Sequence, residues 1–120
     1  MLYKKLLYSF VAPTAAPQNF YVVAINRTAI EVEWDLPPSN DRGGIIRGYK
    51  LYYQSTSSGV EQIINISDNT TDVYIVNGLE PATSYRFSVL AYTNVGDGPR
   101  SIHLTIPTLS ENASPYMSLD

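Results

Sequence analysis

Apolar and polar residues alternate with a period of two along most of the chain. In the stretch IEVEW, which ends at Trp34, three apolar residues are separated by two glutamates. Successive side chains of a β-strand point to opposite faces, so this alternation predicts a strand with one buried face and one solvated face. The pattern recurs in runs over residues 19–25, 30–34, 45–54, 60–67, 72–79, 84–92 and 101–108.

Turn-forming residues separate these runs at intervals of roughly ten residues. The stretch DLPPSNDRGG at 35–44 holds two prolines and two glycines, and it predicts an irregular loop. No amphipathic helical periodicity is found between the runs. The sequence therefore predicts an all-β fold, a seven-stranded antiparallel β-sandwich with Greek-key connections.

Composition limits the kinds of protein that remain. With 120 residues, 44% of them hydrophobic, the chain is long enough for one domain with one core. A formal net charge of −3 gives no basic excess of the kind that a nucleic-acid or anionic membrane surface requires. The absence of cysteine excludes disulfides, cysteine-based zinc sites and thiol catalysis.

Two terminal segments lie outside the predicted sandwich. Residues 1–16 are expected to be a leader or linker, with a short basic region followed by apolar residues. The small residues Ala12, Ala15 and Ala16 would suit cleavage of a weak signal peptide, and the alternatives are a flexible leader or the arbitrary start of a fragment. Residues 109–120 lack apolar periodicity and are expected to be a flexible tail or linker.

The glycine-rich stretch TNVGDGPRS, residues 93–101, has the composition of a ligand-binding loop. A phosphate loop requires a helix after its glycines, whereas here a predicted strand follows. A calcium loop requires several oxygen ligands at fixed spacing, and Asp97 stands alone. The stretch is therefore predicted to be a hairpin tip, with Gly96 and Gly98 at positive φ and Pro99 capping the return strand.

Several landmarks occur in an order that is typical of one known family. Pro17 and Phe20 open the first predicted strand, and Trp34 ends the second before a Pro-Pro pair. The stretches IRGYKLYY, GLEPATSY, TNVGDGP and IPT then follow in that order. Over residues 17–108 the chain resembles a fibronectin type III domain. The resemblance implies an immunoglobulin-like β-sandwich with fibronectin type III topology.

The resemblance also implies which side chains build the core. Trp34 is expected between the two sheets, and Tyr85 is expected to form a tyrosine corner. In such a corner the phenolic hydroxyl bonds to backbone a few residues upstream, near Leu79 to Pro81. The predicted structural core consists of Trp34, Tyr49, Leu51, Tyr53, Leu79, Pro81, Tyr85, Phe87 and Val89.

Two loops are expected at the same end of the sandwich and are candidates for binding. The resemblance implies that the second of them is the loop in which a known family member carries the integrin-binding Arg-Gly-Asp tripeptide. The matching residues here read Val-Gly-Asp, so binding of that type is not expected. The candidate loop residues are Asn40, Asp41 and Arg42 in the first loop and Val95, Gly96 and Asp97 in the second.

The outward side of the third and sixth strands offers a second candidate surface. Tyr52, Leu90 and Tyr92 are expected to share it because these two strands are neighbours in this fold. Exposed tyrosines are common in protein interfaces, and the alternative is a cross-strand cluster that only stabilises the sheet.

No arrangement of residues predicts catalysis. Glu31 and Glu33 share one face of a strand and are interpreted as part of a solvated outer surface. His103, the only histidine, is expected to face solvent, out of phase with Ile102 and Leu104, which are expected to point inward. The chain is therefore predicted to be no enzyme, with no cofactor, no metal site and no small-molecule substrate.

Four Asn-X-Ser/Thr sequences match the N-glycosylation pattern, which is more than chance leads us to expect. They begin at Asn26, Asn65, Asn69 and Asn112, at predicted turns, strand ends or the tail. They favour an extracellular setting, and the alternative is that these residues simply form turns.

Together these features predict a non-catalytic protein-interaction and spacer module of a larger cell-surface or extracellular adhesion or receptor protein. Its partners are expected to be proteins of unknown identity, with similar domains as neighbours in a longer chain. Two alternatives remain open. One is a spacer in a multidomain enzyme, such as a receptor tyrosine phosphatase or a secreted glycoside hydrolase, and the other is an intracellular structural module.

Overall fold

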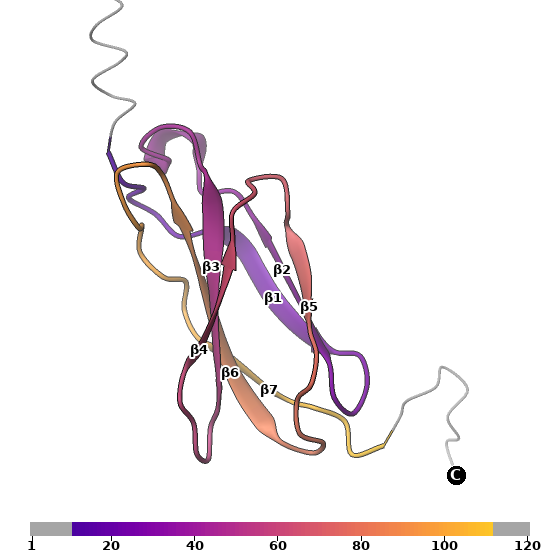
Figure 1. Cartoon of the computed structure of the whole chain (residues 1–120). Coiled ribbons are helices and arrows are strands. Elements are labelled where there is room, and N and C mark those ends of the chain that lie inside the picture. The colour runs from indigo at the N-terminus through magenta and orange to yellow at the C-terminus, as the bar shows by residue number, and fades with distance from the viewer. Residues whose placement is uncertain (1–10, 112–120) are drawn as a thin grey trace, which may run out of the picture.

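A computed structural model describes residues 11–111, which form two antiparallel β-sheets packed face to face (Figure 1). One sheet has the strand order β1-β2-β5, with β1 (Gln18–Ala24), β2 (Ile30–Asp35) and β5 (Val73–Val76). The other has the order β4-β3-β6-β7, with β4 (Gln62–Ile66), β3 (Gly48–Ser55), β6 (Ser84–Tyr92) and β7 (Leu104–Pro107). A single 3₁₀ turn, η1 (Ser39–Asp41), lies between β2 and β3. The predicted seven-stranded antiparallel sandwich is confirmed.

The core lies between the sheets and is dominated by aromatic rings. Trp34 on β2 is 2% exposed, and its ring centroid lies 5.3 Å from that of Tyr49 on β3. At the other end of the core, Tyr53 stacks on Phe87 with centroids 5.9 Å apart. Of the residues expected in the core, Tyr53 and Pro81 are half-buried, and the others are buried: Trp34, Tyr49, Leu51, Leu79, Tyr85, Phe87 and Val89.

The crossing from β5 to β6 is held by the hydroxyl of Tyr85. The backbone N–H of Glu80 donates a hydrogen bond to this hydroxyl over 2.9 Å, which is the contact expected of a tyrosine corner. The neighbouring Thr108 hydroxyl donates to the carbonyl of Glu80 over 2.6 Å and accepts from the N–H of Thr83 over 3.0 Å. The corner is therefore joined to the segment that leaves the domain after β7.

The last strand departs from the sequence prediction. It begins at Leu104, and Ile102, which was expected to point inward, is 77% exposed. The N–H of Ser101 bonds to the carbonyl of Val89, whereas Leu104 pairs with Phe87, so three residues on one side match two on the other. Such a one-residue slip is a β-bulge, and it moves the side chain of Ile102 to the solvent face.

The tyrosine corner gives a direct test of the fold. Tyr85→Phe should lower the free energy of unfolding by about 1–2 kcal/mol, because it removes the partner of a partly buried backbone N–H. The matched control is Tyr92→Phe in the same strand, whose hydroxyl bonds to exposed Asn65, and it should cost less than about 0.5 kcal/mol. Urea denaturation of the chain measures both values, and equal losses would contradict the role of the corner.

Candidate interaction surface at the loop end

Three loops meet at one end of the sandwich, here called the loop end (Figure 1). They join β2 to β3 (36–47), β4 to β5 (67–72) and β6 to β7 (93–103). They meet because the start of β3 pairs with the ends of β6 and β4, and the start of β5 pairs with the end of β2. Both candidate binding loops therefore lie at the same end of the domain.

A segment that precedes β1 lies between the two candidate loops. The N–H of Val11 donates to the carbonyl of Gly43, and the Thr93 hydroxyl donates to the carbonyl of Val11 over 2.8 Å. Thr14 bonds twice to Asp41, through its N–H to the carbonyl and through its hydroxyl to the carboxylate, each over 2.9 Å. Residues 11–14 thus bridge loops that lie far apart in the sequence. No periodicity or motif signals these contacts.

The glycines of the β6–β7 loop have a different role from the predicted one. Positive φ at Gly96 and Gly98 was expected, but neither residue has it; the glycines with positive φ are Gly43, Gly44 and Gly78. A Cβ at position 98 would lie 2.7 Å from the Cβ of Pro13, whereas one at position 96 would meet nothing closer than 3.9 Å. Gly98 is needed for close packing against the segment 11–14, and not for the turn itself.

Two charged residues of the candidate loops are occupied by contacts within the chain. Arg42 donates from Nε to the carbonyl of Pro37 over 2.8 Å, which closes its own loop. Asp97 accepts from Nζ of Lys50 over 3.0 Å, and this hydrogen bonding raises the pKa of Lys50. Asn40 and Val95 are exposed, and Gly96 is half-exposed. The loop end therefore offers a mixed apolar and polar surface, on which Asp97 is paired with Lys50 and Arg42 is held by a backbone carbonyl.

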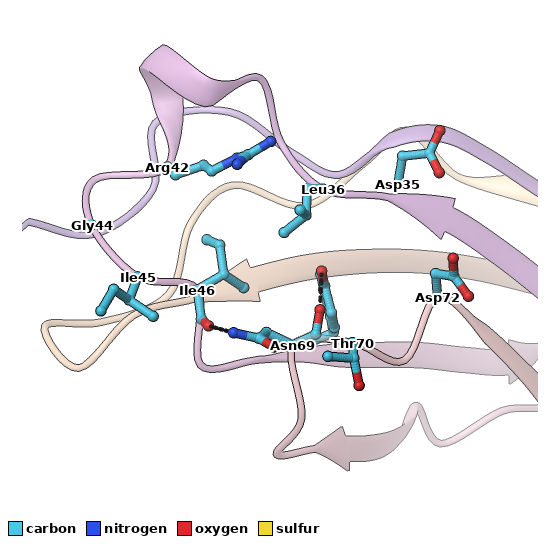
Figure 2. Close-up of a pocket in the computed structure, with 10 residues that line it drawn as sticks. Asp35, Leu36, Arg42, Gly44, Ile45, Ile46, Asn69, Thr70 and Asp72 are labelled. Carbon is cyan, nitrogen blue, oxygen red and sulfur yellow. Dashed lines mark hydrogen bonds between the residues drawn. The ribbon is translucent and has the colours of Figure 1, made fainter.

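A hollow of about 780 Å³ opens between the β2–β3 and β4–β5 loops (Figure 2). Its floor is fixed by Asn69. The side-chain amide of Asn69 donates to the backbone carbonyl of Ile46 over 2.8 Å, and its backbone carbonyl accepts a hydrogen bond from the Tyr49 hydroxyl over 3.3 Å. Burial raises the pKa of Tyr49. The rim carries apolar Leu36 and Ile45 and the carboxylates of Asp35 and Asp72. This lining suits a peptide or protein side chain.

The second candidate surface, on the outer side of the four-stranded sheet, is largely covered. Tyr52 and Leu90 were expected to be exposed, but they are 6% and 4% exposed, and Tyr92 is half-buried. The guanidinium of Arg100 lies 3.4 Å from the ring centroid of Tyr52 and makes two hydrogen bonds to Glu61, of 2.9 and 3.0 Å. Of the two interpretations of this surface, the structure supports the cross-strand cluster and not the open tyrosine face, because the bulged chain before β7 carries Arg100 across Tyr52.

The remaining candidates are placed as follows. His103, Glu31 and Glu33 lie on the outside of the sandwich, as expected. Hydrogen bonding to Arg100 lowers the pKa of Glu61. Residues 11–111 contain no cluster of three His, Asp or Glu side chains suited to a metal ion. In the same range no helix has the length and apolarity to cross a membrane.

The N-glycosylation sequences differ in how their asparagines are used. Asn26 accepts hydrogen bonds at its side-chain oxygen from the N–H and hydroxyl of Thr28, and Asn65 accepts the Tyr92 hydroxyl. In both asparagines these hydrogen bonds end on the side-chain oxygen, and the side-chain amide nitrogen takes no part in them. Asn69 differs because its amide nitrogen holds Ile46. Asn112 lies outside the described residues.

The fold and its landmarks define an immunoglobulin-like sandwich, and comparisons with known proteins agree. The model of the fibronectin type III domain matches residues 15–107, and the chain belongs to this family. It is 37% identical over 102 residues to protein sidekick-1 of Gallus gallus, which covers 82% of the chain and 5% of that protein. It is 34% identical over 99 residues to receptor-type tyrosine-protein phosphatase F of Danio rerio, covering 81% of the chain and 5% of that protein.

A solved structure supports the same assignment. The third fibronectin III domain of the human KIAA0343 protein superimposes with a TM-score of 0.75 at 29% identity, covering 88% of this chain and 90% of that one. The chain spans only about 5% of the length of the curated relatives named above.

Two glycine variants test the packing of the segment 11–14. Gly98→Ala should lower the free energy of unfolding by about 1–3 kcal/mol, because its Cβ overlaps that of Pro13 and something must shift. Gly96→Ala is the matched control in the same loop, and it should change stability by less than about 0.5 kcal/mol. Amide exchange should also show faster exchange of the Val11 and Thr14 N–H groups in Gly98→Ala alone. Equal behaviour of the two variants would contradict the packing role of Gly98.

Proposed function

We propose that this chain is a non-catalytic protein-interaction and spacer module of a larger cell-surface or extracellular adhesion or receptor protein. The observation that carries the proposal is that the described chain enters and leaves the sandwich at opposite ends, and that each end is hydrogen-bonded to the domain (Figure 1). Neighbouring domains joined at these points would follow one another roughly in line.

Both attachment points are fixed by specific bonds. Val11 and Thr14 are held by the β2–β3 loop at the entry. At the exit, the N–H of Leu109 donates to the carbonyl of Asn26, and the N–H of Ala82 donates to the carbonyl of Leu109. A segment bonded to the domain on both sides transmits orientation better than a free linker, which behaves as a flexible coil. This favours a stiff spacer.

The loop end is the proposed contact surface for a protein partner. Its loops are already held by hydrogen bonds, so binding would cost little ordering entropy. Val95 and Ile45 are exposed apolar side chains on two of these loops, and the hollow beside Ile45 has polar groups on its rim. Apolar contacts surrounded by polar groups are typical of transient protein interfaces.

A spacer within a multidomain enzyme is the second candidate, and the similarity to a receptor-type tyrosine phosphatase favours it. Both candidate functions imply that this chain is non-catalytic and that any catalytic activity belongs to other domains of the protein. They differ only in the domains that accompany it.

Activity assays test the non-catalytic part of the proposal. The purified chain, incubated with generic phosphatase and glycosidase substrates, should give rates equal to those of a heat-denatured sample, since nearly all of it is a fibronectin type III domain and the sequence predicts no catalytic arrangement. Turnover above that control, lost on heating, would overturn this part of the proposal.

Glycan mapping tests the extracellular setting. In an Asn112→Gln background, secreted from eukaryotic cells, Thr28→Ala and Ser67→Ala should each remove one glycan, from Asn26 and Asn65. Thr71→Ala should remove none, because the amide nitrogen of Asn69 is engaged by Ile46. Glycosidase digestion with intact-mass measurement reads out each variant. A chain that carries no sugar at all would remove this support for an extracellular location, and sugar on Asn69 would contradict the structural argument.

A further inference from the structure

The outer face of the β1-β2-β5 sheet carries an ordered pattern of apolar and acidic side chains. Tyr21 pairs with Glu33, which pairs with Val73, so these three residues form one row across the sheet. A parallel row is formed by Val23, Glu31 and Ile75. The two glutamates thus lie along the middle strand, with large apolar side chains on both sides. We call these six residues the acidic-centred face.

The apolar side chains of this face are well exposed. The exposed fractions are 49% for Tyr21, 39% for Val23 and 44% for both Val73 and Ile75. Single exposed apolar residues are ordinary on a protein surface, but four of them on one sheet face, on both sides of a pair of carboxylates, are typical of an interaction site.

The charges of this face are not neutralised within the described chain. The ion pairs among residues 11–111 are Lys50–Asp97 and Arg100–Glu61, and both lie on the other sheet or its loops. The pKa of Glu31 is raised mainly by hydrogen bonding with Glu33, and to a smaller extent by partial desolvation and by repulsion from the Glu33 carboxylate. Asp35, next along the outer side of β2, accepts a hydrogen bond from Asn19. An incoming cationic group would relieve the repulsion between the two glutamates.

A second copy of this chain does not suit the acidic-centred face. Packing two such faces together would bring Glu31 and Glu33 against the same residues of the other copy. Like charges placed together in an interface are unfavourable, and the net charge of −3 adds to the repulsion. The charge of the face therefore favours a different protein with basic groups at its centre.

The spacing of the face matches one α-helix. Strands lie about 4.8 Å apart, so the apolar pair on β1 (Tyr21 and Val23) and the apolar pair on β5 (Val73 and Ile75) are separated by about 10 Å. This distance is close to the diameter of a helix with its side chains. Glu31 and Glu33 lie about 6.7 Å apart along the strand, and residues four apart on a helix rise about 6 Å.

We propose that the acidic-centred face binds an amphipathic helix of a partner protein, with a central row of Lys or Arg side chains and an apolar row on either side. The basic row would pair with Glu31 and Glu33, and the apolar rows would cover Tyr21 and Val23 on one side and Val73 and Ile75 on the other. This site lies on a sheet face, separate from the loop end, and does not depend on the function proposed for that end.

A designed helical peptide provides the probe. It carries lysines at positions i, i+4, i+7 and i+11 with leucines on both flanks, and a control peptide has glutamate in place of each lysine. Titration into the ¹⁵N-labelled 120-residue chain should shift amide resonances of β1, β2 and β5 for the lysine peptide alone. Shifts located mainly on the four-stranded sheet or the loop end, or equal binding of both peptides, would overturn the proposal.

Variants of the chain separate specific docking from general attraction. The double variant Glu31→Gln/Glu33→Gln should weaken binding of the lysine peptide by about fivefold or more. Val73→Ser/Ile75→Ser should weaken it while leaving the charges intact. The matched control is Glu80→Gln, an exposed glutamate outside the face, which should change the Kd by less than about twofold. Equal effects of Glu80→Gln and the double glutamate variant would overturn the proposal. Circular dichroism confirms that each variant is folded.

Discussion

The burial of Trp34 against Tyr49 is the contact on which the rest of the structure depends. The chain has no cysteine, so no disulfide can join the two sheets, and this aromatic pair fills the space between them. The pair also reaches the loop end, because the Tyr49 hydroxyl bonds to the carbonyl of Asn69. Asn69 in turn holds Ile46 in the β2–β3 loop. Core packing and the shape of the hollow are therefore parts of one connected network.

The opposite end of the domain is organised by polar contacts of a similar kind. Tyr85 fixes the crossing through Glu80, and Thr108 ties the same backbone to the chain that follows β7. The segment 11–14 performs the corresponding task at the loop end. In both places a connecting segment is bonded to a structural landmark of the sandwich, so the direction of the chain on either side follows from the fold itself.

The strands and the aromatic core could be predicted because they follow from alternation, which each segment encodes locally. The sequence predictions failed where contacts between segments distant in sequence decide whether a side chain is buried or exposed. Ile102 faces solvent because the chain slips against β6, and Tyr52 is buried because the same slip brings Arg100 over its ring. Gly98 has a packing role because Pro13, remote in the sequence, lies against it. None of these contacts leaves a periodic signal, since the first two depend on the register of paired strands and the third on a segment outside any strand.

The two outer faces of the sandwich differ in how far the rest of the described chain covers them. Arg100 and Glu61 cover the tyrosine of the four-stranded sheet, so an apolar surface there is closed by the domain's own charges. On the three-stranded sheet no described segment plays this part, and Glu31 and Glu33 stand between exposed apolar rows. A nearby cation stabilises a pair of neighbouring carboxylates, and burial stabilises exposed apolar side chains. Both effects therefore favour the same kind of external partner, one with a basic centre and apolar flanks. The physical asymmetry between the faces is therefore a reason to look for binding on the smaller sheet.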